Sequence, residues 1–179
     1  MDQAARAVIA PLPENLLRHP LDYLQADHLR QHRLCDLLES ILRNPKAKES
    51  KASLDIVLDY LKVELPRHIA DEEEDLFPRL KASCLPGDNI DEMMQVLREE
   101  HTQNAILLNS IEDALSSQKA RSDPDAPILS GVVFAEAKRR HIRWENTLIL
   151  PLARARLGAE DLRDLGRGMA TRRNIPFPD

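Results

Sequence analysis

The sequence contains little of what β-rich and disulfide-stabilised proteins require. Aromatic residues make up 3% of the 179 residues and glycine occurs only 5 times, which argues against a β-sandwich or barrel with aromatic strands and glycine-rich turns. The two cysteines, Cys35 and Cys84, are too few for a disulfide framework or a thiolate metal site. This cysteine usage favours the reducing cytoplasm as the location.

Membrane-spanning, secreted and nucleic-acid-binding proteins have signatures that the sequence also lacks. No apolar run approaches the roughly 18 residues of a membrane span, and residues 1–13 lack the basic and apolar regions of a signal peptide. The net charge of -5 and the pI near 5.7 show no basic surplus, so we expect neither a membrane nor a nucleic acid as partner. With 42% apolar and 31% charged residues, the chain is typical of one globular domain.

Apolar residues recur at helical spacing over four long segments and one short segment. The expected helices span approximately residues 20–43, 50–80, 89–117, 128–156 and 159–171. We expect Pro66 to kink the second helix and Asp88 to cap the third. Long helices joined by short loops predict an all-α fold, an antiparallel four-helix bundle with a short extra C-terminal helix. In this interpretation residues 1–19 form an extended N-terminal segment, 20–157 the bundle, and 158–179 the short C-terminal helix and tail.

One short motif occurs twice, once in the second expected helix and once in the fourth. It consists of a histidine, a glutamate four residues later and a proline ten residues after the histidine: His68-x3-Glu72-x5-Pro78 and His141-x3-Glu145-x5-Pro151. Residues four apart share one face of a helix, so each His–Glu pair can ligate one metal ion, or the carboxylate can bridge two. The helical phase turns both pairs toward the apolar side, whereas Glu74 faces water.

Two further histidines complete this arrangement. His101 lies on the apolar face of the third expected helix, and His28 lies near that of the first. Four consecutive helices therefore each direct one histidine inward, and two of them add a glutamate. Burying these groups without a partner would be costly, and a metal ion would offset that cost. Mixed imidazole and carboxylate ligands suit iron, manganese or zinc, and six ligands exceed one tetrahedral zinc site, which favours two metal ions.

The order of these residues resembles the hemerythrin-like (HHE cation-binding) family over about residues 20–157. The segments that carry the resemblance are Asp27-His28-x3-His32, His68-x3-Glu72-Glu73-x3-Phe77-Pro78, Glu100-His101 and His141-x3-Glu145-Asn146-x4-Pro151. The resemblance implies a non-haem di-iron centre inside a four-helix bundle. The cofactor it implies is a pair of iron ions joined by an oxo or hydroxo bridge, with manganese or zinc as alternatives. Its terminal ligands would be His28, His68, His101 and His141, and its bridging ligands Glu72 and Glu145.

The sequence departs from the pattern of the family at the fifth histidine. Oxygen carriers have a second histidine one turn after the one in the third helix, where this chain has Ala105, and iron–sulfur repair members take one from the segment after the first helix, where residues 33–67 contain none. His32 is the remaining candidate, although it lies off the apolar stripe. Gln31 and Asn104 lie closer to the apolar faces and are candidates for supporting the ligands.

The resemblance implies a metal-binding protein that interacts with O2, NO or peroxide, in sensing, storage or detoxification. One alternative is a redox enzyme that reduces peroxide or NO, or that donates iron to damaged iron–sulfur clusters. No general acid or base outside the expected ligands stands out, which favours a metal-binding protein over a dedicated enzyme. The other alternative is a metal-free interaction bundle, which metal loading would not stabilise.

Overall fold

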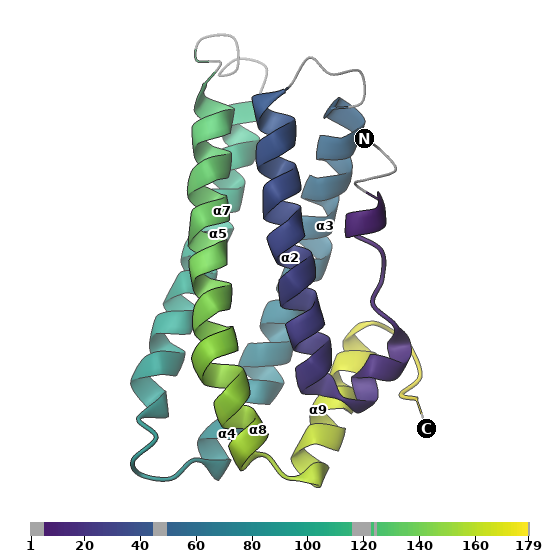
Figure 1. The fold of residues 1–179 in the computed structure, drawn as a ribbon, viewed down its shortest axis with the longest axis vertical. Helices are drawn as coiled ribbons and strands as arrows, with labels where there is room; N and C mark the ends of the chain where they lie inside the picture. Colours follow the sequence, from purple (N-terminus) through teal and green to yellow (C-terminus); the bar gives the residue numbers. More distant parts are fainter. Residues whose placement is uncertain (1–5, 45–49, 116–122, 124, 179) are drawn as a thin grey trace.

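The computed structural model describes residues 6–44, 50–115, 123 and 125–178, and the regular secondary structure of these residues is entirely helical. Four long helical runs lie side by side (Figure 1). Their bounds are α2 (Pro20–Arg43); α3 (Ser50–Ala70) continued by η2 (Asp71–Leu76) and α4 (Phe77–Ser83); α5 (Ile90–Leu115); and α7 (Ala126–Trp144) continued by η3 (Glu145–Ile149) and α8 (Leu150–Arg156). In Figure 1, α2 and α5 run from bottom to top, whereas α3 and α7 run from top to bottom. The prediction of an all-helical fold is confirmed.

A layer of buried polar side chains separates two apolar clusters inside the bundle. The first cluster includes Leu24, Phe77 and Leu97, and the second includes Leu38 and Phe134. Among the described residues, every buried polar side chain except that of Ser53 lies between these clusters along its helix; we call this set the polar layer. Its members are Asp27, His28, Arg30, Gln31, His68, Asp71, Glu72, His101, Asn104, Lys138, His141 and Glu145.

The second and fourth runs each contain a π-helical segment where the sequence predicts continuous α-helix. The N–H of Phe77 donates to the carbonyl of Glu72, and the N–H of Leu150 donates to that of Glu145, each five residues back. In both runs the next residue is the proline of the repeated motif, which has no N–H and whose ring crowds the carbonyl four residues back. The wider π turn accommodates this proline without ending the helix. The proline of the motif thus marks the turn that carries the motif glutamate.

The two ends of the described chain pack against each other. The short C-terminal helix α9 (Ala159–Arg172) contacts η1 (Glu14–Arg18), α2 and η2. The prediction of an extended segment over residues 1–19 is wrong at residues 6–8, which are helical. It is also wrong at Glu14–Arg18, which form a 3-10 helix that buries Leu17 in the first cluster. Gly166 lies so close to the carbonyl oxygen of Leu17 that a side chain there would overlap it. Residues 1–5 lie outside the described part of the chain.

Two other helix starts differ from the sequence prediction. The third run begins at Ile90, so Asp88 is not its capping residue; the Asp88 carboxylate instead accepts the N–H of Leu85 and pairs with Arg156. The fourth run begins at Ala126, two residues earlier than expected, because a proline in its first turn suits a helix start. Across the described helices, none combines the length and apolar character that crossing a bilayer demands.

Candidate metal centre

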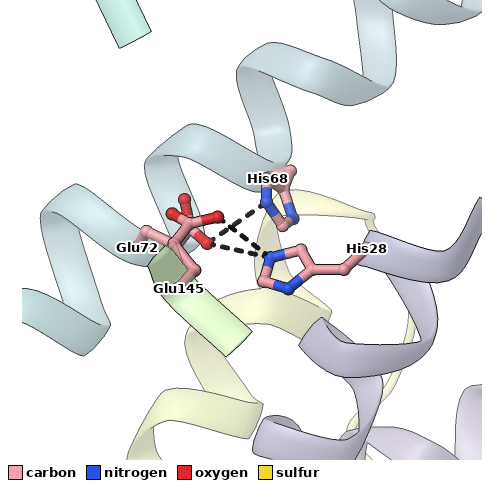
Figure 2. A group of neighbouring side chains, drawn as sticks. All are labelled: His28, His68, Glu72 and Glu145. Atoms are coloured by element: carbon pink, nitrogen blue, oxygen red, sulfur yellow. Dashed lines mark ion pairs between the residues drawn. The ribbon is translucent and has the colours of Figure 1, made fainter. Parts of the chain in front are cut away.

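The polar layer brings together all six side chains that the sequence indicates as metal ligands. They come from the four different helical runs, the two glutamates lie in the π segments, and none is more than 3% exposed. We call these six residues the cluster. They form two overlapping groups, within each of which the ligand atoms lie within 4.8 Å of one another: His28, His68, Glu72 and Glu145, and Glu72, His101, His141 and Glu145. Figure 2 shows the first group, in which both imidazole rings face the two carboxylates.

Each cluster histidine presents its Nε2 atom to a carboxylate. The Nε2–oxygen distances are 3.4 Å for His28–Glu72, 3.3 Å for His28–Glu145, 3.2 Å for His68–Glu72, 3.3 Å for His101–Glu72, 3.8 Å for His101–Glu145 and 3.0 Å for His141–Glu145. Glu72 and Glu145 thus lie between two pairs of histidines. In this position each carboxylate can share its oxygens between two metal ions.

The other ring nitrogen of each cluster histidine faces an oxygen acceptor. The Nδ1 partners are Asn146 for His28 at 2.8 Å, Asp27 for His68 at 2.9 Å, Glu73 for His101 at 2.7 Å and Glu100 for His141 at 3.0 Å. Nδ1 of His28, His101 and His141 forms a hydrogen bond with its oxygen partner, so it carries the proton and leaves the Nε2 lone pair of a neutral ring free for a metal ion. Nδ1 of His68 is paired with Asp27 by charge. Metal-ligating histidines are commonly held by such partners, which fix the ring and raise its basicity.

The cluster also contains buried polar atoms that no hydrogen bond satisfies. Within the described residues, Nε2 of all four cluster histidines, Nδ1 of His68, Oε2 of Glu72 and both carboxylate oxygens of Glu145 have no hydrogen-bond partner. Buried groups of this kind are costly unless something binds them. Imidazole nitrogens and carboxylate oxygens together suit iron, manganese and zinc. The residues present therefore fit a pair of metal ions.

The buried carboxylates and imidazoles of the cluster shift one another's pKa values. Burial alone would raise the pKa of Glu72, but His68 and the other facing imidazoles hold it well below its ordinary value. Burial alone would lower the pKa of His68, but Glu72 and Asp27 raise it to about 10. Without metal, a proton on His68 compensates the charge of the buried carboxylates that face it. A metal ion bound there would take over this role, and the nitrogens that hold it would lose their protons.

His32, the remaining candidate ligand, does not join the cluster. It is exposed on α2, and among the described residues no metal-ligating group includes it. It lines a surface pocket of about 450 Å³ together with His28 and Asn146. The pocket therefore reaches one cluster histidine from the outside. Ala105, where oxygen carriers have a further histidine, is exposed on α5.

The acceptors that hold the histidines went unrecognised as such in the sequence, although each lies next to a cluster residue. Asp27 and Glu100 directly precede cluster histidines, and Glu73 and Asn146 directly follow cluster glutamates. Their sequence signal is this adjacency, together with their place in the segments that carry the family resemblance. Of the two supporting residues that the sequence suggested, Gln31 donates its amide to Asp27 at 3.1 Å. Asn104 is buried one turn after a cluster histidine, and its Nδ2 has no hydrogen-bond partner within the described part of the chain.

A family comparison agrees with this geometry. A model of the hemerythrin HHE cation-binding domain matches residues 19–153. The chain belongs to this family. The match ends before α9, and it includes every residue of the cluster and all four Nδ1 partners. No curated protein and no solved structure matches the chain.

In this hemerythrin-domain protein, ion pairs connect the C-terminal helix to the polar layer. Asp71, next to Glu72, is fully buried and accepts hydrogen bonds from Arg172 at 3.0 Å and from Arg173 at 2.7 Å. Arg173 also donates to the hydroxyl of Tyr23 at 3.0 Å. These bonds connect α9 to η2 and α2. The segment beyond the family match therefore helps to hold the π turn that carries Glu72.

Proposed function

We propose that this protein is a di-iron protein with the antiparallel four-helix arrangement of hemerythrins, and that it interacts with O2, NO or peroxide in sensing, storage or detoxification. The observation that supports it most is the double orientation of the four histidines. Each directs a free Nε2 at Glu72 or Glu145, and its Nδ1 lies within 3.0 Å of an oxygen of another side chain. A metal-free interaction bundle has no need for such an arrangement, and the unsatisfied atoms would destabilise it.

The two overlapping groups suggest how the ions would be shared. His28 and His68 would hold one ion, His101 and His141 the other, and Glu72 and Glu145 would contribute to both. Iron bound there supplies redox chemistry, because it can bind and exchange electrons with small oxidants. The protein's part is to keep the six ligands oriented and out of bulk water. The two apolar clusters on either side of the polar layer perform this exclusion.

Elemental analysis together with a visible spectrum tests this proposal. The protein is purified at low oxygen, loaded with ferrous iron, and then exposed to air. We expect about two iron ions per chain, and ligand-to-metal bands that change on exposure to air and again on addition of NO. Less than one metal ion per chain after loading, or zinc alone with no uptake of iron, would overturn the di-iron proposal. A His32→Ala variant serves as the matched control, because His32 lies outside the cluster, and it should load like the natural protein.

A further inference from the structure

A pocket of about 580 Å³ lies apart from the cluster, where α2 and α3 meet the two ends of the described chain. Its volume is in the range of small-molecule binding sites, about 300–1,000 Å³. Of the fourteen described residues that line it, four belong to residues 9–14, ahead of the family match, and two, Arg173 and Ile175, follow the match. No cluster residue is among the fourteen. The ends of this chain therefore add a pocket to the hemerythrin domain, separate from the metal centre.

Two guanidinium groups form the buried, charged part of the pocket wall. Arg30 on α2 and Arg173 directly after α9 line the pocket, and their side chains are only 7% and 9% exposed. Arg30 lies over the ring of Tyr60, with 4.9 Å between its Cζ and the ring centroid, and Arg173 lies over the ring of Tyr23 at the same distance. Burial raises the pKa of Tyr23, and Arg173 and Arg30 act against the rise. Both positive charges therefore lie near one tyrosine hydroxyl.

Neither guanidinium group uses all of its hydrogen-bond donors within the described protein. A guanidinium group has five N–H donors. Three of those of Arg30 bind Asp27 and the carbonyl oxygen of Ala10. Four of those of Arg173 bind Asp71, a tyrosine hydroxyl and a backbone carbonyl of α9. Each group thus keeps an N–H donor that no described residue accepts. Because the existing bonds hold both groups in place, a ligand would meet donors that are already oriented.

The remaining lining offers an apolar surface and little competing negative charge. Glu14 and Asp59 are exposed to solvent, which screens their charges, and Glu64 pairs with Arg67 at 2.6 Å. The two carboxylates that hold the buried arginines do not line the pocket themselves, so a ligand meets the guanidinium groups and not their partners. The aliphatic lining residues are Ile9, Pro11, Leu12, Ile56, Val63 and Ile175.

A carboxylate suits the free donors, and a hydrocarbon chain suits the aliphatic lining. Guanidinium groups bind carboxylates through strong, charge-assisted hydrogen bonds, whereas an ammonium group would meet two like charges. We propose that this pocket binds an aliphatic carboxylic acid in its ionised form. The carboxylate lies at Arg30 and Arg173, and the hydrocarbon chain packs against the aliphatic lining. The site goes beyond the proposed metal centre and needs no metal ion.

Calorimetry with octanoate tests this site. Octanoate, octylammonium and octanol carry the same hydrocarbon chain, so their affinities compare the head groups alone. The protein is used as isolated, and its metal content is measured. We expect octanoate to bind at least about tenfold more tightly than either of the other two molecules. Octylammonium or octanol binding as tightly as octanoate would overturn the proposed ligand class, and a lack of octanoate binding would overturn the site.

Val63 offers a matched pair of variants that differ in the sign of one charge. Its side chain lines the pocket and is 49% exposed, so the fold should tolerate a charged residue there. Val63→Glu adds a negative charge to the pocket wall and Val63→Lys a positive one. We expect Val63→Glu to bind octanoate at least about fivefold more weakly than Val63→Lys, at equal metal content, whereas octanol should not distinguish them. Equal octanoate affinity would show that the carboxylate binds elsewhere, the metal centre included, and would refute the site.

Arg173→Lys tests the carboxylate end of the same site. Lysine keeps the positive charge beside Asp71 but lacks the guanidinium fork, so octanoate binding should weaken at least about fivefold. The matched control is Arg154→Lys, since Arg154 is 44% exposed, pairs with Asp22 and is not among the pocket residues. Equal octanoate affinity in these two variants overturns the proposed site. A protein that binds octanoate as expected but takes up no metal ion overturns the metal centre alone.

Discussion

Replacing Glu72 by glutamine tests whether the buried carboxylate holds the metal ions. Glu72 is the carboxylate that faces three cluster histidines, His28, His68 and His101, at 3.2–3.4 Å. Glutamine has the same shape but no charge, and it cannot share two equivalent oxygens between two ions. The variant should therefore bind at most one metal ion, and bind it weakly. Glu74→Gln is the matched control, because Glu74 lies on the same π segment but is 68% exposed and pairs with Arg172.

The size of the expected effect follows from ligand linkage. A ligand that binds only the folded state stabilises it by about 2.7 kcal/mol when its free concentration is 100 times its Kd. For a chain of this length, 1 kcal/mol shifts the melting temperature by roughly 2–4 °C. Metal should thus raise the melting temperature of the natural protein, and of Glu74→Gln, by about 5–11 °C under these conditions. In Glu72→Gln the rise should shrink to less than half.

Thermal unfolding with and without metal measures this difference. Each variant is compared with its own metal-free form, so any change in the stability of the metal-free protein cancels. Ferrous iron at low oxygen and zinc are both used as the metal, since the ligand set suits either. Equal metal-induced shifts in Glu72→Gln and Glu74→Gln would show that the cluster does not bind metal through this carboxylate, and the reasoning would fail.

Three further predictions concern the surroundings of the cluster. Asp27→Asn keeps the size of the side chain that holds a cluster histidine but removes its charge, so metal affinity should fall by about 10–100-fold, as measured by competition with a chelator. Gly166→Ala places a methyl group against the carbonyl oxygen of Leu17 and should lower stability by about 1–3 kcal/mol in denaturant titrations; an unchanged midpoint would mean that η1 moves freely. Burial raises the pKa of the Cys35 thiol to about 11, and the thiolate is the form that an alkylating reagent attacks. At pH 8 the reagent should therefore modify the half-buried Cys84 first, as mass spectrometry can show. Modification of Cys35 should accelerate as the pH rises toward 11. Equal labelling of both cysteines at pH 8 would contradict the buried position of Cys35.

The residues of the cluster could be predicted because helix geometry converts spacing into position. A histidine and a glutamate four residues apart must share a face, and the apolar stripe on each helix showed which face is buried. The same reasoning excluded Glu74, which the structure finds exposed. His32 lies off the apolar stripe, and the structure finds it exposed, as this reasoning indicates.

The partners of the histidines could not be predicted by the same route. Each of them reaches across to a different helix: Asn146 to His28, Asp27 to His68, Glu73 to His101 and Glu100 to His141. Spacing along one helix carries no information about which side chains meet between helices. The rotation and height of each helix decide these contacts, and both follow from packing of the whole core. The π turns were not predicted from the sequence either. Each of them shifts the phase of its helix by one residue after the glutamate, and spacing along one helix does not reveal this shift.

The structural features that normally destabilise a helical protein lie at one level along the helices of this protein. Buried carboxylates, a buried lysine, prolines within helical runs and π turns each cost stability, and a chain selected only for stability would avoid them. Here they all lie in or beside the polar layer, between two apolar clusters that follow the rules closely. Such a concentration of local defects in an otherwise regular fold is what a functional site produces. The polar layer therefore indicates the functional site on physical grounds that do not depend on the motif, and Lys138, which the motif does not include, belongs to it by the same argument.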